Sequence, residues 1–168
     1  MVSTGASACI KCPAGKYAAA SASTICTECP AHTFSVVGSI ILLNCTCTKG
    51  YTGPDGVECT ACDAGGFKDT NGSAACTPCS QGKYSTVTAT IFNDSCQDCP
   101  FSTYSVVGIG LLTNCTCNKG YTGPDGMECA ACRAGTYKDV IGSALCSLCS
   151  GFMSPALPAP HRNWFWCC

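Results

Sequence analysis

The spacing of the cysteines is the feature of this sequence that most constrains its fold. The chain has 20 cysteines among its 168 residues, a proportion typical of disulfide-crosslinked scaffolds. Because the spacing recurs, we interpret the thiols as structural parts of a repeated unit, joined either as disulfides or as zinc ligands. The pattern Cys-x-x-Cys recurs along the chain, beginning at Cys9, Cys26, Cys59, Cys76, Cys96, Cys129 and Cys146.

The composition favours crosslinks in place of an apolar core. The hydrophobic fraction of 46% includes the cysteines, so the remaining residues supply little apolar surface. The formal net charge is −1, and a disordered chain of low hydrophobicity would be expected to carry a high net charge. The nine Lys and Arg residues are scattered, whereas a nucleic-acid surface needs a basic cluster. We therefore expect small disulfide-rich modules and no nucleic-acid partner.

The sequence contains a long internal repeat. The segment from Cys26 to Cys79 aligns without gaps onto the segment from Cys96 to Cys149, and Lys49-Gly50-Tyr51-Thr52-Gly53-Pro54-Asp55-Gly56 recurs unchanged at 119–126. Such periodicity predicts a linear array in which each unit contacts mainly its neighbours. The predicted divisions are a partial N-terminal module (1–25), a first full repeat (26–79), a linking loop (80–95), a second full repeat (96–149) and an irregular Pro-rich tail (150–168).

A shorter pattern, Cys-x-x-Gly-x-aromatic, recurs within these units and is first seen from Cys12 to Tyr17. Glycine permits a left-handed turn, and we expect the aromatic ring to lie over a disulfide as the one large buried surface of each module. Pro-Asp-Gly at 54–56 and 124–126 predicts turns, and residues 33–37 and 103–107 predict short strands. The predicted fold is a small disulfide-rich, elongated tandem array of cysteine-rich modules with short β-hairpins and turns and almost no helix.

Zinc binding is the alternative use of the thiols. The quartets Cys9/Cys12/Cys26/Cys29 and Cys59/Cys62/Cys76/Cys79 approach a four-cysteine zinc spacing. However, Cys45-x-Cys47 and Cys115-x-Cys117 belong to no such quartet. The chain also carries Asn-x-Ser/Thr sequons, which matter in a secreted protein. We therefore favour disulfides and expect no metal and no cofactor. The predicted glycosylation sites are Asn44, Asn71, Asn93 and Asn114.

The connectivity stays open between two schemes. In a serial scheme, the first thiol of each Cys-x-x-Cys pairs backward and the second pairs forward, and each closed loop contributes about 3 kcal/mol in the chain-entropy model. The rival is a crossed scheme, such as Cys12–Cys29 with Cys26–Cys45. The serial scheme leaves Cys9 and Cys149 without their partners. Its bonds are Cys12–Cys26, Cys29–Cys45, Cys47–Cys59, Cys62–Cys76, Cys79–Cys96, Cys99–Cys115, Cys117–Cys129 and Cys132–Cys146.

The two ends of the sequence suggest a piece of a longer protein. Residues 1–8 have neither a basic start nor an apolar stretch, so no signal peptide is expected there. The longest apolar run, 36–43, is far shorter than the roughly 20 residues of a membrane span. The pattern fails after Cys149, and we interpret 151–168, with its terminal Cys167-Cys168, as a truncated or mis-spliced end. A lipidated cytosolic terminus is the alternative for that cysteine pair.

Several of these motifs resemble the ephrin-receptor-like cysteine-rich repeat. They are the segments 12–17, 45–56 and 115–126 together with the Cys-x13-Cys-x2-Cys spacing. That family is related in style to tumour-necrosis-factor-receptor modules and EGF-like modules. The resemblance implies that Cys47 pairs with Cys59 and that Cys117 pairs with Cys129, as the last two cysteines of an EGF module do.

The expected function is structural. His32 and His161 lie in different contexts, so no catalytic constellation is seen and we expect no enzyme. We interpret the chain as an extracellular or cell-surface repeat segment that acts as a structural or adhesive spacer within a larger protein. The alternatives are a ligand-binding ectodomain of the tumour-necrosis-factor-receptor style, which should show one unit with an exposed apolar patch, and an intracellular zinc array. Both the spacer and the receptor interpretation are compatible with an extracellular protein partner, and the sequence does not indicate which protein that is.

Overall fold

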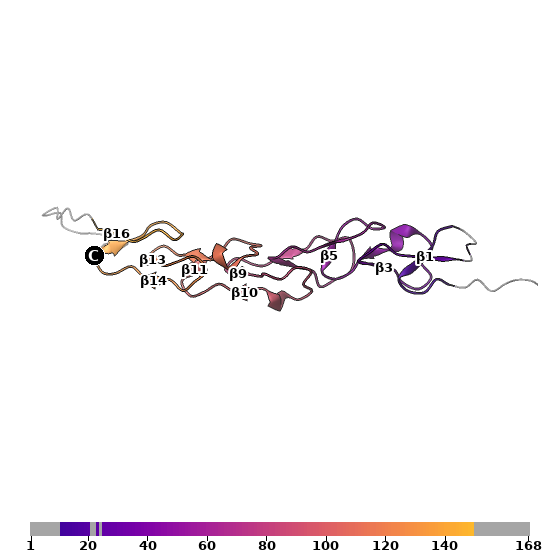
Figure 1. Cartoon of the computed structure of the whole chain (residues 1–168), viewed down its shortest axis with the longest axis horizontal. Helices are drawn as coiled ribbons and strands as arrows, with labels where there is room; N and C mark the ends of the chain where they lie inside the picture. The colour runs from indigo at the N-terminus through magenta and orange to yellow at the C-terminus, as the bar shows by residue number, and fades with distance from the viewer. Residues whose placement is uncertain (1–10, 21–22, 24, 150–168) are drawn as a thin grey trace, which may run out of the picture.

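The chain forms an elongated rod that runs from its first to its last modules without folding back (Figure 1). The structure is a computed structural model and describes residues 11–20, 23 and 25–149. The predictions made for Cys9 and for the tail at 150–168 lie outside the described residues. Within the described part, the secondary structure consists of very short strands and three single-turn 3-10 helices. The predicted class, a small disulfide-rich tandem array with almost no helix, is confirmed.

Each strand pairs antiparallel with its neighbour along the chain, and the described residues thus form a series of separate two-stranded hairpins. The strands at 33–37 and 103–107 are shorter than predicted, because the chain leaves each hairpin after two residues to reach the preceding module. The elements are β1 (Lys16–Ala18), β2 (Cys26–Glu28), β3 (Thr33–Phe34), η1 (Leu42–Asn44), β4 (Thr46–Cys47), β5 (Tyr51–Thr52), β6 (Thr60–Ala61), β7 (Gly66–Phe67), β8 (Thr77–Pro78), β9 (Lys83–Tyr84), η2 (Asn93–Ser95), β10 (Gln97–Asp98), β11 (Thr103–Tyr104), η3 (Leu112–Asn114), β12 (Thr116–Cys117), β13 (Tyr121–Thr122), β14 (Ala130–Ala131), β15 (Thr136–Tyr137) and β16 (Ser147–Leu148).

One disulfide closes each hairpin, and we use the word module for a hairpin together with the bond that closes it. The bonds follow the serial scheme and not the crossed one. Cys149 is disulfide-bonded as well, so the expectation that it lacks a partner is wrong. The eight bonds with both partners described are Cys12–Cys26, Cys29–Cys45, Cys47–Cys59, Cys62–Cys76, Cys79–Cys96, Cys99–Cys115, Cys117–Cys129 and Cys132–Cys146.

The core of the rod is made of cystine. Cys45, Cys47 and Cys79 are completely buried, and Ile109 is the one buried apolar side chain in the described part that is not a cysteine. The expectation that the aromatic rings form the large buried surfaces is wrong. Tyr17 is half-buried, and Tyr137 is 43% exposed. A rod one or two hairpins thick has no interior wide enough for a ring, whereas a disulfide fits between two strands.

Left-handed residues at the hairpin turns confirm the role predicted for the glycine of the short pattern. Gly15 and Gly82, for example, have φ angles of 80° and 78°, which glycine adopts without a steric penalty. His32 and Ser102 occupy the same turn in their modules with φ angles of 59° and 60°. His32 is exposed and its ring stacks on Tyr51 with centroids 4.0 Å apart.

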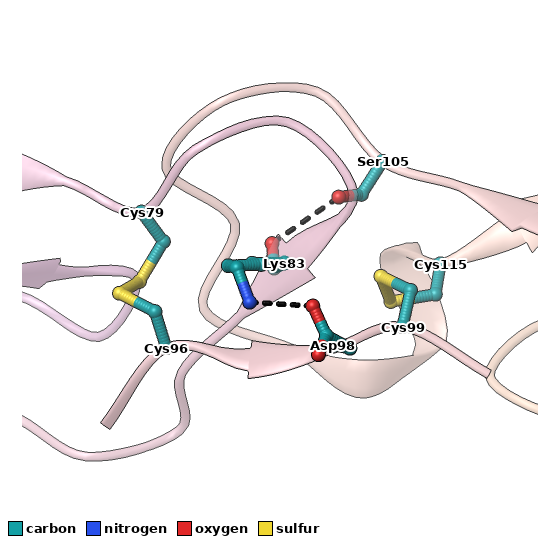
Figure 2. A network of polar contacts seen from close by, with 7 residues as sticks. All are labelled: Cys79, Lys83, Cys96, Asp98, Cys99, Ser105 and Cys115. Carbon is teal, nitrogen blue, oxygen red and sulfur yellow. Dashed lines mark hydrogen bonds and ion pairs between the residues drawn. A yellow bond between two sulfur atoms is a disulfide. The ribbon is translucent and has the colours of Figure 1, made fainter. Parts of the chain in front are cut away.

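Each module is also hydrogen-bonded to the one before it. In several modules, the carbonyl of the first cysteine accepts an N–H from the next module's loop, as in Gly38 N to Cys12 O (2.7 Å) and Gly108 N to Cys79 O (2.9 Å). Figure 2 shows a second link, in which the buried Ser105 hydroxyl donates to the carbonyl of Lys83 in the preceding hairpin at 3.2 Å. These hydrogen bonds hold successive hairpins in a fixed order along the rod.

Loss of one disulfide should therefore loosen one module and leave distant modules folded. The Cys62→Ser/Cys76→Ser and Cys132→Ser/Cys146→Ser pairs each remove a bond that spans 14 positions. Each should cost about 3 kcal/mol, because the open loop regains its entropy in the unfolded chain. Hydrogen exchange should show the lost amide protection around 62–76 in the first variant and around 132–146 in the second. Equal loss of protection along the whole rod would contradict the linear-array interpretation.

Candidate functional site: junction lysines and exposed turns

Lys68 lies where three successive modules meet. Its side chain is 2% exposed, and its ammonium donates hydrogen bonds to the carbonyl of Tyr51 at 2.7 Å and to that of Gly72. Its own backbone joins the neighbouring modules, because the Lys68 carbonyl accepts from Gly50 N (2.9 Å) and the Lys68 amide donates to Thr90 O (3.0 Å). The residue therefore ties the Cys47–Cys59, Cys62–Cys76 and Cys79–Cys96 modules together.

Lys138 repeats this arrangement in the second copy of the repeat. Its side chain is 5% exposed, and its ammonium donates to the carbonyls of Tyr121, at 2.8 Å, and Gly142. A buried ammonium is stable only when its protons are hydrogen-bonded. Two buried lysines with the same partners indicate that a Lys at this position is part of how modules join.

The electrostatics of the Lys68 site combine burial with an acidic neighbour. Desolvation lowers the pKa of the Lys68 ammonium, and the Asp55 carboxylate partly offsets this by raising it. The Oδ1 atom of Asp55 is buried, with no hydrogen-bond partner among the residues that the structure describes. The attraction between the two groups thus acts through space at the junction.

Sequence reasoning missed these lysines. The one sequence signal that could have found them is their shared position. Lys68 and Lys138 each follow the aromatic residue of the short pattern and precede an Asp. A lysine is mostly exposed in folded proteins, and that general rule made a surface interpretation the natural one. One carbonyl partner, that of Tyr51, comes from another hairpin and cannot be read from the local sequence, whereas Gly72 is four residues further along the chain.

The surface of the rod carries exposed apolar side chains at equivalent places in the two full repeats. They lie in the loops that precede and form η1 and η3, and in the turns after Gly56 and Gly126. These residues are Val36, Val37, Ile41, Leu42 and Val57 in the first repeat, and Val106, Val107, Leu111, Leu112 and Met127 in the second. Part of the apolar surface is therefore repeated, but Ile40 and Leu43 are exposed only in the first repeat, where the second has Gly110 and Thr113.

The predicted glycosylation sites all lie on the surface. Asn44, Asn93 and Asn114 are exposed and belong to the three 3-10 turns, one to each. Asn71 is exposed in a separate loop, where its side-chain oxygen accepts a hydrogen bond from the Lys49 amide at 3.0 Å. Their use as glycan acceptors stays a prediction.

The cysteines of the described chain offer no thiolate to a metal. Cys59, Cys62, Cys76 and Cys79, which form the second zinc-like quartet, are each joined in a disulfide. Within the described residues, no group of His, Cys, Asp or Glu is arranged to hold a metal ion. The sulfur atoms act as crosslinks in this structure.

A hollow of ≈ 330 Å³ lies beside the Cys62–Cys76 bond. Its wall combines small residues such as Gly65 and Ala64 with Gly108 from a later module, and Asp63 is its one ionisable side chain. An added Cβ at Gly65 would lie 2.3 Å from the Gly108 carbonyl oxygen. The hollow thus marks a close contact between modules.

Replacement of Lys68 should weaken the junction far more than replacement of a surface lysine. Lys68→Met removes the donor from the carbonyls of the half-buried Tyr51 and Gly72 and should destabilise the junction by about 1–3 kcal/mol. Lys83→Met is the matched control, because Lys83 forms a partly exposed ion pair with Asp98 at 2.5 Å and should cost less than about 1 kcal/mol. Native-state hydrogen exchange of the backbone amides at positions 50 and 68 measures the destabilisation caused by each substitution. Equal effects of the two substitutions would show that Lys68 is not a structural link.

Removal of the Asp55 charge should lower the pKa of Lys68 further. Asp55→Asn abolishes the attraction that raises this pKa and leaves desolvation unopposed. Between the usual lysine pKa and the lowered pKa of Lys68, the unfolded chain then binds more protons than the folded chain. The free energy of unfolding of the variant should therefore fall more steeply than that of the parent as the pH drops through this window. An NMR titration of the lysine ε-carbons measures the shift. An unchanged Lys68 titration would exclude the coupling to Asp55.

Comparison with known proteins gives one family. Residues 1–38 match the family described as Tyrosine-protein kinase ephrin type A/B receptor-like. No curated protein sequence matches the chain. The matched segment contains the Cys12–Cys26 bond and part of the next module, and the same type of closed hairpin continues to the Cys132–Cys146 bond. The family match over residues 1–38 and the disulfide-linked array that continues beyond it together support an ephrin-receptor-like cysteine-rich repeat.

Proposed function

We propose that the chain is an extracellular structural spacer that holds its two ends at a fixed separation. The observation that carries this proposal is the covalent path along the rod. Between one disulfide and the next, the chain has only two residues in Cys26-x-x-Cys29 and one in Cys45-x-Cys47. A pull on the ends passes through the sulfur–sulfur bonds and these short links, so the loops supply no slack.

The disulfides and the family support an extracellular location. Structural disulfides persist in oxidising compartments and are rare in the cytosol. The ephrin-receptor-like cysteine-rich repeat is a receptor-like, non-catalytic type of module. The described residues contain no helix with the length and apolarity of a membrane span.

A receptor that binds one ligand through one module is the second candidate function. That hypothesis expects a single unit with a distinctive apolar patch. Many of the exposed apolar residues instead recur at equivalent places, such as Leu42 and Leu112, although Ile40 and Leu43 have no apolar counterpart in the second repeat. This repetition favours a spacer, or an adhesive surface that is used many times, over a single ligand site. We propose that such a surface binds an extracellular protein partner, and we do not propose which protein this is.

Mechanical extension of single molecules tests the spacer. The oxidised chain, held at residues 11 and 149, should show no stepwise gain in length at forces that unfold hydrogen-bonded hairpins. Cys79→Ser/Cys96→Ser opens a loop that spans 17 positions and should add about 50 Å of extension, since an extended residue spans at most about 3.6 Å. Addition of a reductant should produce similar steps in the parent chain.

Two outcomes would contradict the proposal. The first is an oxidised parent chain that lengthens as readily as the variant, which would show that the disulfides do not carry the load. The second is a chain that stays compact with its thiols reduced, or that needs a metal to fold. Peptide mapping under non-reducing conditions of the secreted chain identifies the pairs and so accompanies the measurement.

A further inference from the structure

Three of the predicted glycan acceptors lie beside exposed apolar side chains. Asn44 ends η1 directly after Leu43, which is 63% exposed, and Asn93 begins η2 directly after Phe92, which is 61% exposed. Asn114 ends η3 after Leu111 and Leu112, which are 60% and 36% exposed. The same juxtaposition therefore occurs in three modules whose loops differ in sequence.

The 3-10 geometry holds each acceptor close to its apolar neighbours. In η1 and η3, the amide of the following cysteine donates to the first carbonyl of the turn, at 2.9 Å in both Cys45 N to Leu42 O and Cys115 N to Leu112 O. In η2, Cys96 N donates to Asn93 O at 3.0 Å. The following cysteine is buried and disulfide-bonded in each case. The turn is thus fixed on the rod, and it presents the asparagine and the apolar residues together.

We propose that N-linked glycans on Asn44, Asn93 and Asn114 cover the apolar side chains of these three turns. Large contiguous apolar patches are rare on soluble chains and mark surfaces that another group contacts. A glycan attached in the same turn is a bulky, solubilising group, and the C–H faces of its first sugars pack on leucine and phenylalanine side chains. The group that covers the apolar side chains of each turn is therefore a glycan attached to the same chain. The inference rests on the extracellular location proposed above, because the sugar is added during export.

The acceptor must be modified before its disulfide closes. In the transfer, the side-chain nitrogen of Asn44 bonds to C1 of a lipid-linked oligosaccharide, the lipid pyrophosphate leaves, and the nitrogen loses one proton to the transferase. The enzyme has to reach the hydroxyl of Thr46 as well as the asparagine. In the folded rod, Thr46 is half-buried in β4 and Cys45 is completely buried. Transfer at Asn44, and at Asn114 with its equivalent Thr116, therefore precedes formation of Cys29–Cys45 and Cys99–Cys115.

The fourth sequon provides a matched control. Asn71-Gly72-Ser73 lies in a loop in which Asp69, Thr70, Asn71 and Ser73 are exposed and polar, and the exposed apolar residues of this loop are the small Ala74 and Ala75. Ser73→Ala removes this sequon and keeps the Asn71 side chain that bonds to Lys49. The variant loses one glycan, as Asn44→Gln does, without uncovering an apolar turn.

The test uses the full chain secreted from a eukaryotic cell, with peptide mapping of the glycans and of the disulfides. We expect glycan mass on Asn44, Asn93 and Asn114. After enzymatic removal of the sugars from the folded protein, fluorescence of a hydrophobic dye and self-association should both rise. The Asn44→Gln/Asn93→Gln/Asn114→Gln variant should behave like the deglycosylated parent, and Ser73→Ala should behave like the untreated parent.

Three outcomes would overturn the inference. Secretion of an oxidised chain with these three asparagines unmodified would refute it and leave the extracellular location standing. Equal dye fluorescence of the parent before and after deglycosylation would refute the covering role even if the sites are modified, and this comparison does not depend on secretion of the triple variant. A chain that stays reduced and unexported would refute both the inference and the proposed function.

Discussion

The sulfur–sulfur bond is the interaction on which this structure depends. Each hairpin has only two or three residues per strand, and an isolated hairpin of that size is at best marginally stable in water. A disulfide that spans 12 to 17 positions removes enough entropy from the open chain to hold each hairpin closed. The buried residues show the same dependence on disulfides, because the completely buried side chains of the rod are cysteines and small serines such as Ser35 and Ser105.

Closed hairpins alone would form a flexible string, and the junction contacts convert them into a rod. Backbone bonds such as Ala89 N to Cys62 O connect each module to the one before it. The ammonium of Lys68 then satisfies carbonyls that belong to two different modules. A charged group at this place is costly to bury, but a lysine reaches several acceptors at once on a flexible stem. The rod is thus held by covalent bonds within modules and by polar contacts between them.

The sequence was most informative where structure is local. The disulfide loops, the left-handed Gly15 turn and the near absence of helix all follow from spacing over fewer than twenty residues. It was misleading where the thickness of the molecule matters, since a thin rod leaves rings such as Tyr137 exposed. The junction role of Lys68 was out of reach because its partners, Tyr51 and Gly72, come together only when two hairpins stack.

The serial order of the crosslinks bears on how the rod is built during synthesis. Each bond whose two cysteines the structure describes joins residues within 17 positions, so each of these pairs is complete soon after its second member enters the oxidising compartment. Closure can then proceed from the N-terminus, one module at a time. The same order carries a hazard, because a cysteine that takes its neighbour's partner forces each later cysteine to shift by one place. Correct formation of the first described bond, Cys12–Cys26, therefore protects the pairing of the modules made after it.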